Sequence, residues 1–336
     1  MTISSLGDLS VSYQMRRDTA SLKAELQRAT NEISSGYSAD IADKLRGDFA
    51  RLSAIEADLS RLDGYTTNID EFGFLLETQQ GVIGKLRDLA SLSTTLLSIP
   101  VGVGGSALAD FGAEGLSVFT ASLSSLNVQA GGRAVFSGTA SDQAAVADAD
   151  TILLAIEAEI AIAGATTTSD VEAIVDTWFA NGGGFDTVGY TGGDASVTSL
   201  RLSDSERIDP PITAEADGIR QTLASMAMAA LAGRGLFAGD ADERGDVLRR
   251  AGEKLLVANG GLIELQANIG RQEGALGRAS AEVSSQRDGL QIAKAGLIEV
   301  DPYDAATRLQ TAELRLQSLY TLTGRLSRLS LAEYLR

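Results

Sequence analysis

The sequence predicts a mainly α-helical protein: a long antiparallel helical rod, or coiled coil, formed by the N- and C-terminal arms, with a small inserted α+β domain. Three observations predict this fold. The chain of 336 residues has only four prolines, and the blocks between them carry apolar residues at helical spacing. A heptad repeat runs through the C-terminal half. The middle of the chain is instead acidic and rich in glycine.

The first predicted element is a helix over about residues 10–33. Its apolar residues alternate spacings of four and three, which is the pattern of a coiled-coil seam, until Ser34, Ser35 and Gly36 interrupt it. A second, very long helix is predicted from Leu45 to Leu97, where an apolar stripe continues at near-helical spacing. The seam of the first helix consists of Met15, Thr19, Leu22, Leu26, Ala29 and Ile33.

The middle of the chain is predicted to form a small, separate α+β domain. Between residues 137 and 218 there are 15 acidic and two basic residues, which carry −13 of the formal net charge of −17. Helices are expected at 149–161 and 171–180, and short strands within 181–193 and 196–202. The acidic surface is interpreted as a solvated face. Trp178 and Phe179 are expected to lie in the core of this domain, although an exposed pair could instead anchor a partner.

The C-terminal half carries the strongest periodicity. Apolar residues recur there every seven positions. The residues that stand three positions after them are mostly small or polar, so neighbouring helices can approach closely. The triplet Asn259-Gly260-Gly261 leaves open whether 248–297 is one helix or two. The residues that recur every seven positions are Leu248, Leu255, Leu262, Ile269, Leu276, Val283, Leu290 and Leu297.

Asp301 and Pro302 predict the start of a last helix, as an N-cap followed by a first-turn proline. The seam could simply contribute to a bundle within one chain. Because terminal segments fray unless something holds them, we expect the two terminal helices to hold each other. The seam of the last helix consists of Leu309, Ala312, Leu316, Leu319, Thr323 and Leu326.

The composition disfavours most chemistry. The chain has no His and no Cys, which removes thiol catalysis, disulfides and the familiar zinc sites. It lacks a P-loop, and its net charge of −17 disfavours nucleic acid and anionic membranes as partners. No apolar run is long enough to span a bilayer, and the N-terminus lacks the pattern of a cleavable signal. We therefore expect no catalytic residues, no cofactor, no metal and no enzyme activity.

Two weaker motifs are interpreted as structural. The glycine-aspartate stretches 182–186 and 192–194 are faintly similar to a calcium-binding repeat, but a single copy favours a turn. The pairs Glu157 with Glu159 and Asp148 with Asp150 would point apart on a helix, and we expect them to be solvated.

The closing stretch, 300–306 and 325–335, resembles the C-terminal helix of the flagellin superfamily. Members close on a similar Ser-Leu-x-x-Tyr-Leu ending, which here includes Tyr334 and Leu335. Within the superfamily, the segment 131–139 (Gly-Gly-Arg-Ala-Val-Phe-Ser-Gly-Thr) resembles a segment of the hook-associated protein 3 family, the hook-filament junction proteins. Its motif residues are Gly132, Arg133, Phe136 and Gly138. The chain departs from the family at 41–45, at its first residues and at Pro302.

The resemblance implies a structural adaptor between the bacterial flagellar hook and the filament, exported without cleavage and located outside the cell. It implies these partners: hook-associated protein 1, flagellin, identical copies in a ring, and a flagellar export chaperone, with no nucleic acid and no membrane. The seam residues Met15, Leu22, Leu26, Ile33, Leu309, Leu316, Leu319 and Leu326 would then form an assembly interface. Filament flagellin is the first alternative, and a calcium- or ligand-binding adhesin is the second.

On this interpretation the chain has five segments. The outermost two are the N-terminal assembly helix, 1–45, and the C-terminal assembly helix, 301–336. The rod helices occupy 46–136 and 214–300, on either side of the inserted acidic α+β domain at 137–213.

Overall fold

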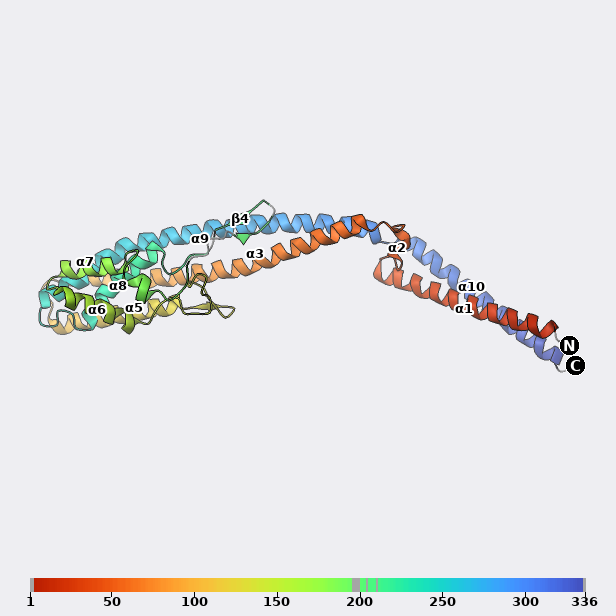
Figure 1. The fold of residues 1–336 in the computed structure, drawn as a ribbon, viewed down its shortest axis with the longest axis horizontal. Coiled ribbons are helices and arrows are strands. Elements are labelled where there is room, and N and C mark those ends of the chain that lie inside the picture. Colours follow the sequence, from red (N-terminus) through yellow and green to blue (C-terminus); the bar gives the residue numbers. More distant parts are fainter. Residues whose placement is uncertain (1–2, 195–199, 204, 210, 335–336) are drawn as a thin grey trace. The chain divides into compact units, whose positions relative to one another are not determined.

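The computed structural model describes residues 3–194, 200–203, 205–209 and 211–334, and most of these residues are helical (Figure 1). The mainly α fold predicted from the sequence is confirmed. The elements in chain order are α1 (Ile3–Ser35), α2 (Ile41–Lys44), α3 (Ala50–Leu89), α4 (Leu92–Leu97), α5 (Gly105–Leu126), β1 (Gln129–Ala130), β2 (Arg133–Ala134), α6 (Ala149–Ala163), α7 (Thr168–Phe179), the π-helix η1 (Phe185–Gly189), β3 (Leu200–Arg201), β4 (Arg207–Ile208), α8 (Asp217–Gly233), α9 (Ala241–Ile298) and α10 (Pro302–Tyr334).

The chain divides into two compact units. Unit 1 contains Met1–Leu62 and Ser284–Arg336, and unit 2 contains Asp63–Val283. Unit 1 is therefore built from the two ends of the sequence, whereas unit 2 is one continuous stretch. This grouping places the segment 137–213 in the same compact unit as α5 and α8. The five ranges predicted from the sequence remain predictions.

Unit 1 pairs α1 with α10 as antiparallel neighbours. The predicted break after the first helix lies at Gly36, whose φ of 76° is a left-handed conformation that favours glycine. The predicted start of the last helix is also confirmed, because the Asp301 carboxylate accepts a hydrogen bond from the Tyr303 backbone N–H at 2.8 Å.

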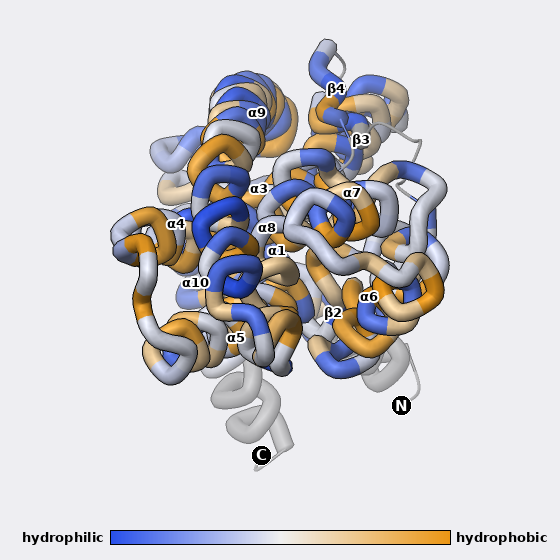
Figure 2. Tube along the Cα trace, turned by 90° about the vertical axis from the view of Figure 1, so that its left-hand side faces the viewer, coloured by the Kyte–Doolittle hydropathy of each residue, from blue (hydrophilic) through white to orange (hydrophobic). Residues whose placement is uncertain are grey.

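Unit 2 is a helical bundle with α8 inside it. In Figure 2, which looks along the helices of this unit, α8 lies among α3, α5 and α7. Helices α5 and α8 touch through their backbones, because a Cβ atom on Gly112 would lie 2.6 Å from the Gly233 nitrogen. Small residues in α8 thus allow its neighbours to approach closely. The side chains of α8 are accordingly almost all buried.

The glycine triplet in the C-terminal half does not end a helix, because α9 continues unbroken from Ala241 to Ile298. A Cβ atom on Gly218 of α8 would lie 2.8 Å from the Gly261 backbone, so close helix packing accounts for Gly261. The heptad positions from Leu248 to Val283 are all buried, with at most 5% of any side chain exposed. Leu290 and Leu297 are half-buried.

The segment 137–213 is more helical than the sequence indicated. The two expected helices are present as α6 and α7, and both pack against α8. The expectation of strands within 181–193 is wrong, because η1 occupies 185–189 and Tyr190 forms an isolated bridge with Val146. The expected strand over 196–202 falls partly outside the described residues, and its end is β3, which pairs with β4 in a two-residue ladder.

The second predicted helix, 45–97, is also divided. Its first residues form a turn in which Arg46 and Gly47 have positive φ, and α3 begins at Ala50, whose N–H is capped by the Asp48 carboxylate. The chain leaves the helix again between α3 and α4.

Candidate assembly interface

The seam between α1 and α10 brings most of the predicted interface residues together. Near its base Ala29 and Ala312 are buried, with 3% and 1% exposed. Thr323 of α10 lies against Met15 of α1, with the hydroxyl oxygen 3.8 Å from the sulfur atom. The predicted residues Met15, Leu22, Leu26, Leu309, Leu316 and Leu319 are all half-buried in the single chain.

The two ends of the predicted seam differ from its middle. Ile33 is 43% exposed although it has the right spacing, so the α1–α10 pair leaves it largely uncovered. Leu326 belongs to α10, but its side chain lies outside the described residues. Each of the two helices covers only one side of the other, which is why the seam residues are half-buried rather than fully buried.

Sequence periodicity missed a polar contact at the base of the helix pair. Glu32 is only 6% exposed, and its carboxylate pairs with the Arg308 guanidinium at 2.9 Å. The same carboxylate accepts a hydrogen bond from the Ala39 backbone N–H at 3.1 Å. The signal that could have revealed this pair is that Glu32 and Arg308 stand next to seam positions on opposite arms.

Backbone contacts hold the two breaks in the arms together beside this ion pair. Tyr37 and Glu299 form an isolated antiparallel bridge. The Ser38 N–H donates to the Ile298 carbonyl at 2.8 Å, and the Val300 N–H donates to the Gly36 carbonyl at 3.0 Å. The two breaks therefore lie at one place in unit 1.

Large apolar side chains also remain exposed on the outer sides of the pair. They are Val11 and Tyr13 on α1, and Tyr303, Leu314, Tyr320 and Leu322 on α10, each at least 48% exposed. A water-exposed helix pair with this much apolar surface is typical of a segment that contacts further protein.

The motif segment 131–139 lies in unit 2 and forms a tight hairpin. Strands β1 and β2 are joined by Gly131 and Gly132, whose φ values of 59° and 79° are those of a type I′ turn. Arg133 is exposed and donates from Nε to the Ser141 hydroxyl at 3.2 Å. The two glycines are thus explained by the turn itself.

The rest of the motif anchors this hairpin. Phe136 is completely buried. Gly138 has a φ of 61°, and a Cβ atom there would lie 2.5 Å from the Gly193 carbonyl oxygen, so the position requires glycine. The other two motif residues lie at the C-terminus: Tyr334 ends α10, with its side chain outside the described residues, and Leu335 is itself outside them.

A buried amide at the base of the segment 137–213 was not predicted. The Gln79 side chain is fully buried, and its Nε2 donates to the Ile212 carbonyl at 2.8 Å and to the Val135 carbonyl at 3.3 Å. The Ala214 N–H donates to the Phe136 carbonyl at 3.0 Å. One side chain of α3 therefore ties together the two chain segments that enter and leave this region.

The expectation that Trp178 and Phe179 seat a core is confirmed. They are 5% and 3% exposed, and their rings pack edge-on with centroids 4.8 Å apart. Phe185 completes the cluster, and the Arg220 guanidinium lies 5.0 Å from the centroid of its ring. Arg220 also pairs with Asp186 at 2.5 Å and with Glu215 at 3.1 Å.

The pKa of the Glu215 carboxylate beside Arg220 is raised from its usual value. Burial raises the pKa of Glu215, and the charges of Asp186 and Asp194 add to the effect while Arg220 opposes it. Burial likewise raises the pKa of Tyr190 to about 12. The Glu215 carboxyl and the Tyr190 hydroxyl are both partly buried and lie near other acidic groups.

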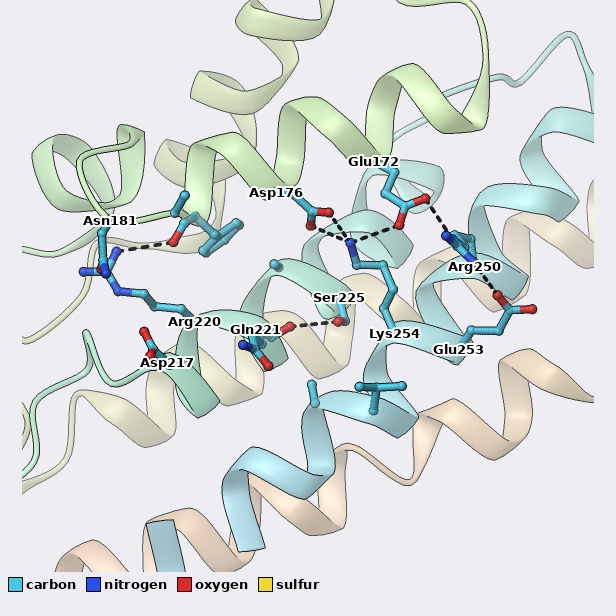
Figure 3. A pocket seen from close by; sticks show the side chains of 15 residues that line it. Glu172, Asp176, Asn181, Asp217, Arg220, Gln221, Ser225, Arg250, Glu253 and Lys254 are labelled. Carbon is cyan, nitrogen blue, oxygen red and sulfur yellow. Dashed lines mark hydrogen bonds and ion pairs between the residues drawn. The ribbon is translucent and has the colours of Figure 1, made fainter. Parts of the chain in front are cut away.

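Unit 2 also contains a cavity of about 790 Å³ between α7, α8 and α9 (Figure 3). Lys254 stands between Glu172, at 3.2 Å, and Asp176, at 2.5 Å. Arg250 pairs with Glu172 at 2.8 Å and with Glu253 at 3.0 Å. Burial alone would raise the pKa of Glu172, but hydrogen bonds from Arg250 and Lys254 prevail and lower it. The charges of these five side chains therefore satisfy one another.

Of the acidic residues of α6 that were expected to be solvated, Asp150 keeps 78% of its side chain exposed, whereas Glu157 is half-buried; both form an ion pair. Arg234 pairs with Asp150 at 2.6 Å and with Glu157 at 2.7 Å. The two carboxylates are seven residues apart and lie on the same helix face. The prediction from the sequence considered only carboxylates two residues apart, so it missed this pair. Asp148 is the N-cap of α6 and accepts a hydrogen bond from the Thr151 N–H.

In the part of the chain that the structure describes, no three His, Cys, Asp or Glu residues are placed to hold a metal ion. Within the same residues, no helix combines the length and hydropathy of a bilayer-spanning segment.

Comparison with solved structures finds matches at low identity, two of which are as follows. A protein of Vibrio parahaemolyticus assigned as flagellar hook-associated is 12% identical, with a TM-score of 0.40, over 76% of this chain and 95% of that one. FlgL of Bacillus cereus is 15% identical, with a TM-score of 0.40, over 75% of this chain and 100% of that one. No protein-family model and no curated protein matches the sequence.

Proposed function

We propose that this chain is a non-catalytic structural subunit of a bacterial flagellum that joins the hook to the filament. In this role it would contact hook-associated protein 1 on one side and flagellin on the other, as one member of a ring of identical copies. It would be exported without cleavage, with the help of a flagellar export chaperone, and act outside the cell.

The observation that carries the proposal is the half-buried seam between α1 and α10. The two helices come from opposite ends of the chain. The described leucines of the seam keep part of their apolar surface in water. Further helices from neighbouring copies would cover that surface, which would stabilise the pair by about 25 cal/mol for each square ångström covered. The motif residues at 131–139 favour the junction protein over the filament subunit, whereas the C-terminal ending resembles that of the whole superfamily.

The test is to replace Leu316 with Asp and to follow incorporation of the protein into flagella. A charged group in the seam has to stay hydrated, so we expect incorporation to be abolished while unit 2 keeps its fold. The single Trp, Trp178, lies in unit 2, and its fluorescence reports that fold independently. Gln317→Asp, on the neighbouring residue of α10, which is polar and exposed, is the matched control. Normal incorporation of the Leu316 variant would contradict assembly through the seam.

Deletion of the gene separates the two flagellar roles. A junction protein predicts cells that keep their hooks and release flagellin into the medium. If instead the purified chain extends into long filaments by itself, it is a filament subunit.

A further inference from the structure

Unit 1 contains a pocket of about 630 Å³ at the base of the α1–α10 pair, beside the bridge between Tyr37 and Glu299. Its walls come from α1, the segment 38–44 and the start of α10. Six carboxylates and three basic groups line it, so its net charge is −3. The carboxylates belong to Glu25, Glu32, Asp40, Asp43, Asp301 and Asp304, and the basic groups to Arg28, Lys44 and Arg308.

Several of these charged groups form ion pairs or helix caps within the chain. Glu32 and Arg308 pair with each other. Asp40 caps α2, and Asp301 caps α10. The remaining carboxylates, those of Glu25, Asp43 and Asp304, form no hydrogen bond or ion pair with another side chain in the described part of the protein.

A stretch of the same helix pair farther from the pocket has the opposite charge. Residues 10–20 and 318–328 contain four arginines and one aspartate, for a net charge of +3. Arg16, Arg17 and Arg325 are exposed, and within the described residues none of them forms an ion pair. The helix pair therefore has an acidic pocket at its base and a basic stretch farther along, called the basic end below, with Asp8 and Glu333 beyond it.

A helix pair of this kind repels an in-register parallel copy and attracts a copy that is shifted along its axis. Arg16 and Glu32 are separated by 16 residues of one helix, which corresponds to a shift of about 24 Å at 1.5 Å per residue. At that shift the basic end of one copy lies beside the acidic pocket of the next, and the half-buried seam remains available to both copies.

We propose that the acidic pocket at the base of the α1–α10 pair receives the arginine-bearing end of the α1–α10 pair of a second copy of this chain. The contact is head-to-tail and repeats from copy to copy. This inference rests on the proposed function, because it specifies how the assembling helices of neighbouring copies are arranged. The charges set the direction and the shift, while the apolar seam supplies most of the affinity.

The chain has no cysteine, so introduced thiols can report the contact directly. Gln14→Cys marks the basic end, and Ser38→Cys marks the pocket. Full-length proteins carrying one substitution each are mixed and treated with a short bis-maleimide. The head-to-tail contact predicts mixed Gln14→Cys/Ser38→Cys dimers in clear excess over dimers of either variant with itself. An excess of same-site dimers would overturn the proposal.

A charge exchange tests the cause. Reversing Arg16 and Arg17 to Glu on the Gln14→Cys partner should lower the yield of mixed dimers about tenfold. Combining that partner with a Ser38→Cys chain that carries Glu25→Lys and Asp43→Lys should restore the yield. Arg271→Glu, an exposed charge reversal in unit 2, is the control and should change nothing. If the arginine reversal leaves the yield of mixed dimers unchanged, or if the charge exchange does not restore that yield, the charge-directed contact is refuted.

The Leu316→Asp experiment keeps the two proposals apart. If that substitution blocks incorporation into flagella and the charge reversals leave cross-linking unchanged, the assembly function stands and the head-to-tail arrangement fails. If the Leu316 variant is incorporated normally, the proposed function fails first.

Discussion

Replacing Gln79 with Met should loosen the base of the segment 137–213. Met has nearly the same length and keeps the apolar contacts, but it cannot donate the two hydrogen bonds to the Val135 and Ile212 carbonyls. A buried acceptor left without a donor costs about 1–3 kcal/mol. The 3.3 Å bond to Val135 is the weaker of the two. The Gln79 Oε1 atom has no hydrogen-bond partner in the native structure, so the removal of this atom offsets part of the lost stability.

We therefore expect the free energy of unfolding of unit 2 to fall by about 2–3 kcal/mol. Urea unfolding followed by the fluorescence of Trp178 measures this quantity, because the only Trp of the chain is buried in unit 2. Hydrogen exchange at the Ala214 N–H, which donates to the Phe136 carbonyl, should accelerate in parallel.

Gln80→Met is the matched control, because Gln80 is the neighbouring half-buried amide and its Oε1 is likewise without a hydrogen-bond partner. Its effect should stay within about 0.5 kcal/mol. Equal effects of the two substitutions, or a Gln79 variant as stable as the native chain, would refute the role assigned to this amide.

Three further outcomes are expected. Gly233→Ala should destabilise unit 2 by about 1–3 kcal/mol, because its new Cβ would meet the backbone of Gly112, whereas Gly239→Ala, with open space around it, should be nearly neutral in the same urea assay. Gly132→Val should destabilise the hairpin by about 1–2 kcal/mol because of its positive φ, and Gly132→Asn should cost less; equal melting temperatures would contradict the type I′ turn. The raised pKa of Glu215 means that the folded state binds its proton more tightly, so the stability of the native chain relative to Glu215→Gln should decrease as the pH rises above 4.5, and an unchanging difference in urea unfolding would count against that pKa shift.

The helices could be predicted because their signal is periodic and local. The seam of α1 and the heptads of α9 follow from the spacing of mostly apolar residues, and the cap of α10 follows from the adjacent pair Asp301 and Pro302. The start of α3 was placed too early because a turn at 45–47 interrupts an apolar stripe that otherwise reads as continuous.

The polar contacts could not be predicted in the same way. Glu32 meets Arg308, and Gln79 meets Ile212, across more than a hundred residues of sequence, and nothing in the local pattern distinguishes these side chains from solvated ones. Gly261 was read as a possible helix end because its reason for being glycine is the backbone of Gly218, which belongs to another helix.

The contact between Gly112 and Gly233 also bears on when the chain can acquire its shape. The two glycines are separated by on the order of a hundred residues, and the rate of folding decreases as contacts join more distant parts of a chain. Helix α5 must therefore wait until α8 has been synthesised before it can bury its apolar side. Until then the apolar surface of α5 that packs on α8 lacks its partner.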